Sequence, residues 1–169
     1  FGTTDTPYAI RLHTNDTRVS FDDLFVGKTS YQTETDIGDF IIRRKDGLFA
    51  YQLAVVVDDC DQGVNHVIRG ADLLSSTPRQ ILIARKLSLE IPHYGHIPLV
   101  IDKKGNKLSK QSRALPVDTS SPLKMLRFAL GILGQDTQDR ATTTTQLLAN
   151  AARQWKRSLV LSTNYVYDA

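Results

Sequence analysis

The stretch VNHVIRGADLLSSTPRQILIARKLSLEIPHYGHIPLVI, residues 64–101, contains the pattern that decides the fold class. Residues 64–69 are short and β-branched, which predicts a short buried strand. A helix start follows, with Thr77 at the N-cap and Pro78 at the first helical position. Residues 97–101, IPLVI, predict a second strand. A strand, a helix and a strand in this order predict an α/β domain.

The regions on either side of this stretch have different patterns. Residues 17–44 alternate β-branched and aromatic residues with turn residues, which predicts antiparallel strands, and residues 45–47 predict a tight turn after them. The apolar run within residues 48–63 fits either a helix or a buried strand. Residues 121–134 begin with Ser-Pro and predict one helix, and residues 145–156 predict a second, amphipathic one.

The bulk composition places few limits on function. The chain has 169 residues, enough for one domain with a small appendage, and no apolar run approaches the roughly 20 residues of a membrane span. Cys60 is the only cysteine, which excludes a disulfide framework or a cysteine zinc cluster and fits a reducing, cytoplasmic setting. The net charge of +3 is compatible with a polyanionic partner but does not require one.

Lys107, Ser109 and Lys110 belong to a tetrapeptide, KLSK, that follows the second strand and a turn. Ammonium groups on such a loop suit a triphosphate, because they can close on the leaving pyrophosphate and stabilise the charge that develops there. Short basic loops are common, so the tetrapeptide taken alone favours a solvated basic turn over a phosphate-binding loop.

A second tetrapeptide, His93-Tyr94-Gly95-His96, has the form of the ATP-binding element that class I synthetases carry at a helix N-terminus. It leads directly into IPLVI, with Pro98 two residues further on and no capping residue, so it does not begin a helix. We therefore expect these histidines to flank a strand and to play no part in binding ATP.

Two further polar residues are candidates for a binding site. Arg69 ends the first strand, where open α/β sheets bind ligands, and could bind a carboxylate. A structural pairing of Arg69 with a nearby aspartate is an equal alternative. Tyr51 stands in an apolar segment, where its hydroxyl could bind a substrate or its ring could belong to the core.

Taken together, VVDD, VIRGADLL, TPRQ, PLV and KLSK resemble, in this order, the glutamyl-tRNA synthetase group of class I aminoacyl-tRNA synthetases. The resemblance is strong over residues 39–111. It implies a partial Rossmann-like catalytic domain, α/β in class, with an antiparallel β insertion before it and a helical segment after it. The implied parts are residues 1–45, part of an acceptor-binding-like insertion; 46–115, the second half of the catalytic domain; and 116–169, a C-terminal helical subdomain.

The resemblance also implies roles for single residues. Tyr51 and Arg69 match later glutamate contacts of the family, and Lys110 matches its ATP-binding lysine. Lys107 and Ser109 belong to the same ATP signature, so Lys107 and Lys110 become the catalytic candidates. Mg²⁺ is expected with ATP, and no metal ligand is assigned in this chain.

By the same alignment, the His-x-Gly-His element of the family lies upstream of Phe1. So do the first glutamate-binding residues and a cysteine-rich zinc element. The resemblance therefore implies a C-terminal part of a synthetase, incomplete and inactive by itself.

About 60 residues follow Lys110, too few for the large anticodon-binding region of a glutamyl-tRNA synthetase. This favours the short branch of the group, whose members use ATP to attach glutamate to queuosine at the wobble position of tRNA(Asp). The expected ligands are glutamate, ATP and queuosine-containing tRNA(Asp), and the expected full-length protein is a monomer with no membrane association. A fragment of a glutamyl-tRNA synthetase, or an RNA-binding module without catalysis, are the alternatives.

Overall fold

The computed structural model describes residues 7–108, 116–138 and 140–167, which fall into two compact units. Unit 1 consists of Phe1–Ile68 and Asp72–Gly95, and unit 2 of Arg69–Ala71 and His96–Ala169. Each unit is described by itself. The predicted three-part division at residues 45 and 115 follows the family rather than compactness, and it stays a prediction.

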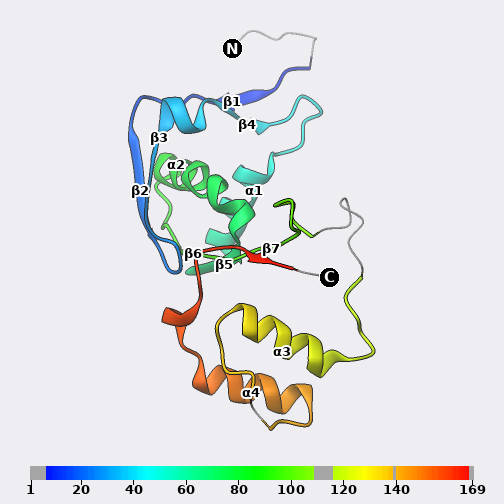
Figure 1. Ribbon diagram of the computed structural model, residues 1–169. Coiled ribbons are helices and arrows are strands. Elements are labelled where there is room, and N and C mark those ends of the chain that lie inside the picture. Colours follow the sequence, from blue (N-terminus) through cyan, green and yellow to red (C-terminus); the bar gives the residue numbers. More distant parts are fainter. Residues whose placement is uncertain (1–6, 109–115, 139, 168–169) are drawn as a thin grey trace. The chain divides into compact units, whose positions relative to one another are not determined.

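Unit 1 begins with two antiparallel strand pairs, shown in blue and cyan in Figure 1. Strand β2 (Arg18–Asp23) pairs with β3 (Gly27–Gln32), and β1 (Ile10–Leu12) pairs with β4 (Phe40–Arg43). The predicted antiparallel strands are therefore confirmed. A single π-helical turn, Thr33–Ile37, separates β3 from β4 and was not predicted.

The apolar run after these strands is a helix, which decides between the two alternatives left open by its sequence. The predicted tight turn is confirmed, because Arg44 N–H donates to the Leu48 carbonyl at 2.8 Å. Helix α1 (Tyr51–Asp61) then begins, and it is closed by Gly63, whose φ of 67° lies in the left-handed region that glycine adopts without strain.

The predicted strand, helix and strand are all present. Strand β5 (His66–Gly70) leads through a 3₁₀ segment (Ala71–Ser76) into helix α2 (Thr77–Leu87), and β6 (His93–Ile97) pairs with β5. The predicted cap was wrong by one residue: Thr77 is already helical and Ser76 precedes it, because the chain enters the helix from the 3₁₀ segment.

Two details of the predicted strands were wrong. The second strand was expected at residues 97–101, but β6 ends at Ile97 and a separate strand, β7 (Val100–Ile101), follows. Pro98 lies at this break, since it has no N–H for a ladder hydrogen bond. The first strand was expected to be buried, yet Ile68 is 50% exposed. Within the described residues β5 pairs with one strand, so its other edge has no strand partner there.

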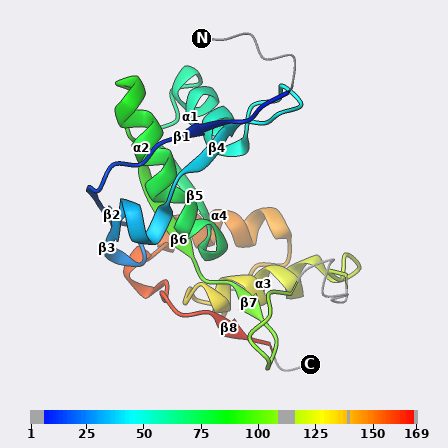
Figure 2. The ribbon, with the colours of Figure 1, turned by 90° about the horizontal axis from the view of Figure 1, so that it is seen from above.

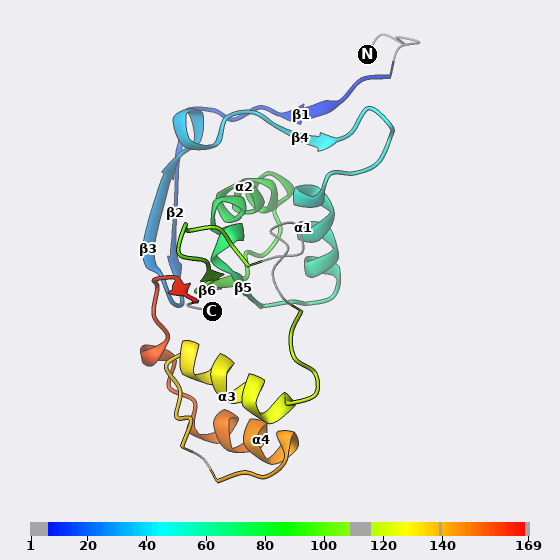
Figure 3. The ribbon, with the colours of Figure 1, turned by 45° about the vertical axis from the view of Figure 1, so that its right-hand side comes forward.

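Helix α2 lies at the centre of the core of unit 1. Ile81 and Ile83 are each 1% exposed, and burial of such a side chain contributes about 1.5–3 kcal/mol. Helix α1 lies beside α2 (Figure 3), and Gln52 of α1 accepts a hydrogen bond from Gln80 of α2 at 2.9 Å. The other buried hydrophobic residues of this core are Val19, Phe40, Val56, Leu82, Ala84 and Tyr94.

Unit 2 contains a pair of helices and a small strand pair. Helices α3 (Pro122–Ile132) and α4 (Thr144–Gln154) are confirmed within two residues of their predicted limits. Strand β8 (Tyr165–Val166) was not predicted; it pairs in parallel with β7, and Figure 2 shows the two side by side. A short 3₁₀ turn, Arg157–Leu159, precedes β8. None of the helices in the described chain is long and apolar enough to cross a membrane.

Candidate functional site

The β5–β6 pair is joined by side chains at both ends. At one end the rings of His66 and His93 lie 4.9 Å apart between centroids. At the other end Arg69 Nε donates a hydrogen bond to His96 Nε2 at 3.0 Å. Both contacts join residues 27 positions apart in the chain, so the two strands run in the same direction. Helix α2 is therefore the crossover of a parallel β–α–β unit.

Arg69 stands where the sequence predicted it, near the C-terminal end of a strand in a parallel pair. This end of an α/β sheet is where ligands bind in such folds. Its partner His96 is fully buried, with 0% of its surface exposed. Because the Nε2 atom of His96 accepts the hydrogen bond, the ring proton resides on Nδ1.

The tetrapeptide HYGH does not begin a helix, as predicted. Its residues form most of strand β6, so the histidines lie within a strand rather than beside one. The sequence analysis assigned no role to His96 because the tetrapeptide was weighed only as an ATP element. The contact between His96 and Arg69 depends on how β5 and β6 pair, so it could be recognised only from the structure.

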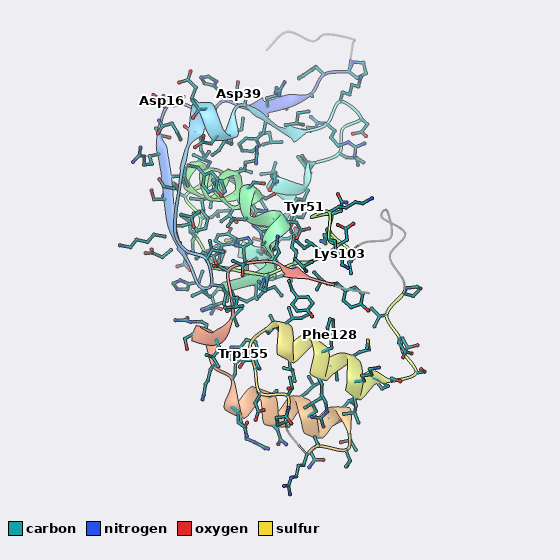
Figure 4. All side chains as sticks on the ribbon, viewed as in Figure 1. Asp16, Asp39, Tyr51, Lys103, Phe128 and Trp155 are labelled. Carbon is teal, nitrogen blue, oxygen red and sulfur yellow. The ribbon has the colours of Figure 1, made fainter. Side chains whose placement is uncertain are left out.

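Tyr51 is the first residue of α1 and is labelled in Figure 4. Its side chain is 52% exposed, so the alternative that it belongs to the core is wrong. An exposed phenol at a helix N-terminus remains available for hydrogen bonding to a ligand. Tyr51 belongs to unit 1, whereas Arg69 and Lys107 belong to unit 2.

Lys107 closes a hairpin that follows β7. It forms an antiparallel bridge with Ile101, and its side chain is exposed. The predicted turn before it is confirmed: the Asp102 carboxylate accepts the backbone N–H groups of Lys104 and Asn106, both at 2.8 Å. These bonds favour the ionised carboxylate, and the pKa of Asp102 is lowered, chiefly by the Asn106 N–H. Ser109, Lys110 and Gln111 lie outside the described residues.

The C-terminal segment that contains β8 forms hydrogen bonds with β7 and with the residue before it. Tyr165 N–H donates to the Leu99 carbonyl at 2.8 Å, and the Asn164 side chain accepts Leu99 N–H at 3.0 Å. Phe128 of α3 (Figure 4) packs edge-on against the ring of Tyr165, with centroids 5.6 Å apart. The sequence analysis missed this strand, because its two residues carry too little local pattern to be recognised without the partner strand.

Side chains that bind metal ions do not form a cluster in the described part of the chain. Across residues 7–108, 116–138 and 140–167, no three His, Cys, Asp or Glu side chains are grouped so that they could hold a metal ion. A mostly apolar hollow of about 390 Å³ in unit 1 is lined by residues of β1, β4, α1 and α2, and none of the predicted site residues lines it.

The fold has neighbours among solved structures. It is similar to the structure of a glutamate tRNA ligase from Elizabethkingia meningosepticum in complex with its amino acid, with a TM-score of 0.77. It is also similar to that of a glutamate–tRNA synthetase from Elizabethkingia anophelis, with a TM-score of 0.75. Each match has 22% identity and covers 97% of this chain and 37% of the other, so it shows the fold alone.

The chain belongs to the family described as tRNA synthetases class I (E and Q), catalytic domain, whose model matches residues 2–130. Its similar relatives are called glutamyl-Q tRNA(Asp) synthetase. The relative from Cupriavidus metallidurans is 51% identical over 144 residues, which are 83% of this chain and 45% of that protein. Those from Leptothrix cholodnii and Pseudomonas putida are 47% and 40% identical, over 88% and 95% of this chain and 50% and 55% of theirs.

These comparisons confirm the resemblance and the fold class predicted from the sequence. Enzymes of this family are ATP-dependent ligases that use Mg²⁺ with the nucleotide. The chain spans about half the length of the curated relatives it matches. The residues predicted to meet ATP carry ammonium and hydroxyl groups, which fit the phosphates of the nucleotide rather than the metal ion.

Proposed function

We propose that this chain supplies the second half of the active site of an ATP-dependent glutamate ligase of the glutamyl-Q tRNA(Asp) synthetase type. The observation that carries the proposal is the position of Arg69. It lies at the carboxyl end of a parallel strand in a family that activates amino acids, and a buried side chain holds its guanidinium. A guanidinium in that place suits the carboxylate of glutamate.

The proposed reaction has two steps. A carboxylate oxygen of glutamate attacks the α-phosphorus of ATP, and the bond to the β,γ-diphosphate breaks, which gives glutamyl-adenylate and pyrophosphate. A hydroxyl of the queuosine cyclopentene ring then attacks the activated carbonyl, loses its proton, and displaces AMP. The product is a glutamyl ester on the wobble nucleoside of tRNA(Asp).

The residues of this chain bind and orient the reactants in this scheme. Arg69 is the proposed partner of a glutamate carboxylate, which a guanidinium can bind through two N–H groups. The resemblance gives Tyr51 as a further glutamate contact, with its phenol hydroxyl as the hydrogen-bonding group. Lys107 and Lys110, with Ser109 beside them, stabilise the negative charge that develops on the leaving pyrophosphate. Mg²⁺ enters bound to ATP.

The net charge of +3 is compatible with a tRNA that docks by its phosphates. Two tRNAs separate this proposal from the closest alternative. Transfer of glutamate to tRNA(Asp) that contains queuosine, and not to the same tRNA with guanosine at the wobble position, supports the short branch. Transfer to the 3′ end of tRNA(Glu) would instead identify a glutamyl-tRNA synthetase.

The first experiment is glutamate-dependent exchange between ATP and pyrophosphate without tRNA. It should be run on the 169-residue chain and on the complete product of the gene that encodes it. We expect exchange by the complete gene product and none by the short chain, because the chain carries only the later part of the predicted site. Exchange by the short chain would show that this half suffices, and would make His93 and His96 candidates for ATP binding. No exchange by the complete gene product would contradict the proposed ligase activity.

A further inference from the structure

We infer that His96 is a positioning residue for glutamate recognition, because it holds the guanidinium of Arg69 by its Nε atom. This inference rests on the proposed function, since it gives His96 a role through the residue that we propose to bind glutamate. No comparison assigns a role to His96. Its sequence context, a His-x-Gly-His tetrapeptide, suggested a different role, in ATP binding, that its place in a strand contradicts.

The geometry of the contact sets the orientation of the guanidinium. The hydrogen bond from Arg69 Nε to His96 Nε2 is 3.0 Å long, and its acceptor has no exposed surface. A planar guanidinium binds a carboxylate well only when its plane and edge are presented correctly. The imidazole is rigid and buried, so a hydrogen bond to it from Nε restricts rotation of the guanidinium plane.

An imidazole is chemically suited to this task. A carboxylate in the place of His96 would also accept from Nε, but its negative charge would offset the positive charge that attracts the substrate. A neutral imidazole supplies a strong acceptor without that charge. Protonation of His96 would remove the acceptor and place two cations side by side, so only the neutral form supports this arrangement.

The matched control lies three residues away on the same strand. His93 is exposed and packs its ring against His66, also exposed, on β5. It therefore reports what replacement of a histidine in this tetrapeptide does when no arginine depends on it.

The test compares four forms of the complete gene product: the wild type, His96→Gln, His96→Phe and His93→Phe. Gln keeps an oxygen acceptor near the position of Nε2, whereas Phe fills a similar volume without an acceptor. Rates of ATP–pyrophosphate exchange give the KM for glutamate at saturating ATP and the KM for ATP at saturating glutamate. Thermal unfolding checks that each variant is folded.

We expect His96→Phe to raise the glutamate KM about tenfold or more, the size expected for loss of a hydrogen bond to a charged group. The KM for ATP should change less than about twofold, because the role proposed for His96 is to hold the arginine that binds glutamate. His96→Gln should restore the glutamate KM to within about threefold of the wild type, since it can accept from Nε. His93→Phe should leave both constants unchanged.

Three results would overturn the inference. One is an unchanged glutamate KM in His96→Phe, and another is an equal rise in both constants, which a purely structural role would produce. The third is a glutamate KM in His96→Gln as high as that in His96→Phe. These outcomes all require a wild type that catalyses exchange. A wild type that does not would instead refute the proposed function, and with it the role of His96.

Discussion

The two ends of the β5–β6 pair each involve a histidine of the same tetrapeptide, and yet they differ in contact and in burial. Each end joins a residue of β5 to a histidine of the HYGH tetrapeptide. At the His66–His93 end both rings are exposed, and water competes for every polar atom. At the Arg69–His96 end the imidazole is buried, so its one acceptor atom is committed to the guanidinium. Burial and hydrogen-bond partner, rather than the motif, are the observations on which the role proposed for His96 rests.

Among replacements of the residues at the two ends of the β5–β6 pair, that of Arg69 should lower activity most. Arg69→Lys keeps the charge but loses both the Nε contact with His96 and the planar fork. We expect kcat/KM for glutamate in pyrophosphate exchange to fall about 100-fold, because one partner of a buried charged hydrogen bond is lost. A decrease of less than threefold would mean that Arg69 does not bind glutamate, and the two ends would then be equivalent.

Gly95, between the two histidines, should have the next largest effect, on stability. A Cβ atom there would lie 2.8 Å from Ile68 Cδ1 and 2.8 Å from Phe25 Cε2. The isoleucine methyl group can move, but the phenylalanine ring is stiffer, so Gly95→Ala should destabilise unit 1 by about 1–2 kcal/mol. Urea unfolding of the 169-residue chain measures this.

Gly131→Ala is the matched control for this prediction. Its new Cβ atom would meet Thr137 Cγ2 at 3.4 Å, an ordinary contact, and alanine favours the helix. We therefore expect its stability to be unchanged or slightly higher. Equal stability of the two variants would contradict the prediction, because it would show that the Ile68 and Phe25 side chains accommodate the added methyl group without cost.

Asp102 provides a charged anchor to compare with the neutral anchor at His96. Its pKa is lowered in the folded chain, so its contribution to the hairpin is present above the unfolded pKa of about 4 and is lost as the pH falls through the lower, folded pKa. We expect the amide signals of Lys104 and Asn106 to shift together in acid. Two-dimensional NMR from pH 7 to pH 2 measures this.

Asp102→Asn is the control for that titration, because an amide keeps an acceptor oxygen but has no charge to lose. In this variant the backbone amide signals of Lys104 and Asn106 should not shift with pH. The effect is small because the hairpin is exposed and solvent screens the carboxylate. A titration that persists in Asp102→Asn would assign it to another group.

The sequence predicted the elements that local signals specify. The turns, the two C-terminal helices and the strand–helix–strand order all rest on residues that are neighbours in the chain, such as Ser121 before Pro122. Strand β8 was missed because its register depends on contacts such as that between Leu99 and Asn164, which are 65 positions apart. A two-residue strand has too little local pattern to predict without its partner.

The same limit applies to the candidate site. Arg69 could be proposed from its place at the end of a predicted strand, and Lys107 from its signature. His96 could not, because its value depends on the parallel register that places it opposite Arg69, 27 positions earlier. The tetrapeptide gave a wrong context: its histidines were compared with an ATP element, while the residue that mattered faced the neighbouring strand.

His93→Ala is the smallest expected effect, and it tests the comparison most directly. The ring is exposed and its described contact is with another exposed ring, so we expect the free energy of unfolding to change by less than about 0.5 kcal/mol. Pyrophosphate exchange by the complete gene product should also stay within twofold of the wild type, with unchanged KM for ATP. If His93→Ala instead abolished exchange, HYGH would act as an ATP element even though it forms a strand. The exposed end of the pair would then be the catalytic one, and the buried end would serve only the fold.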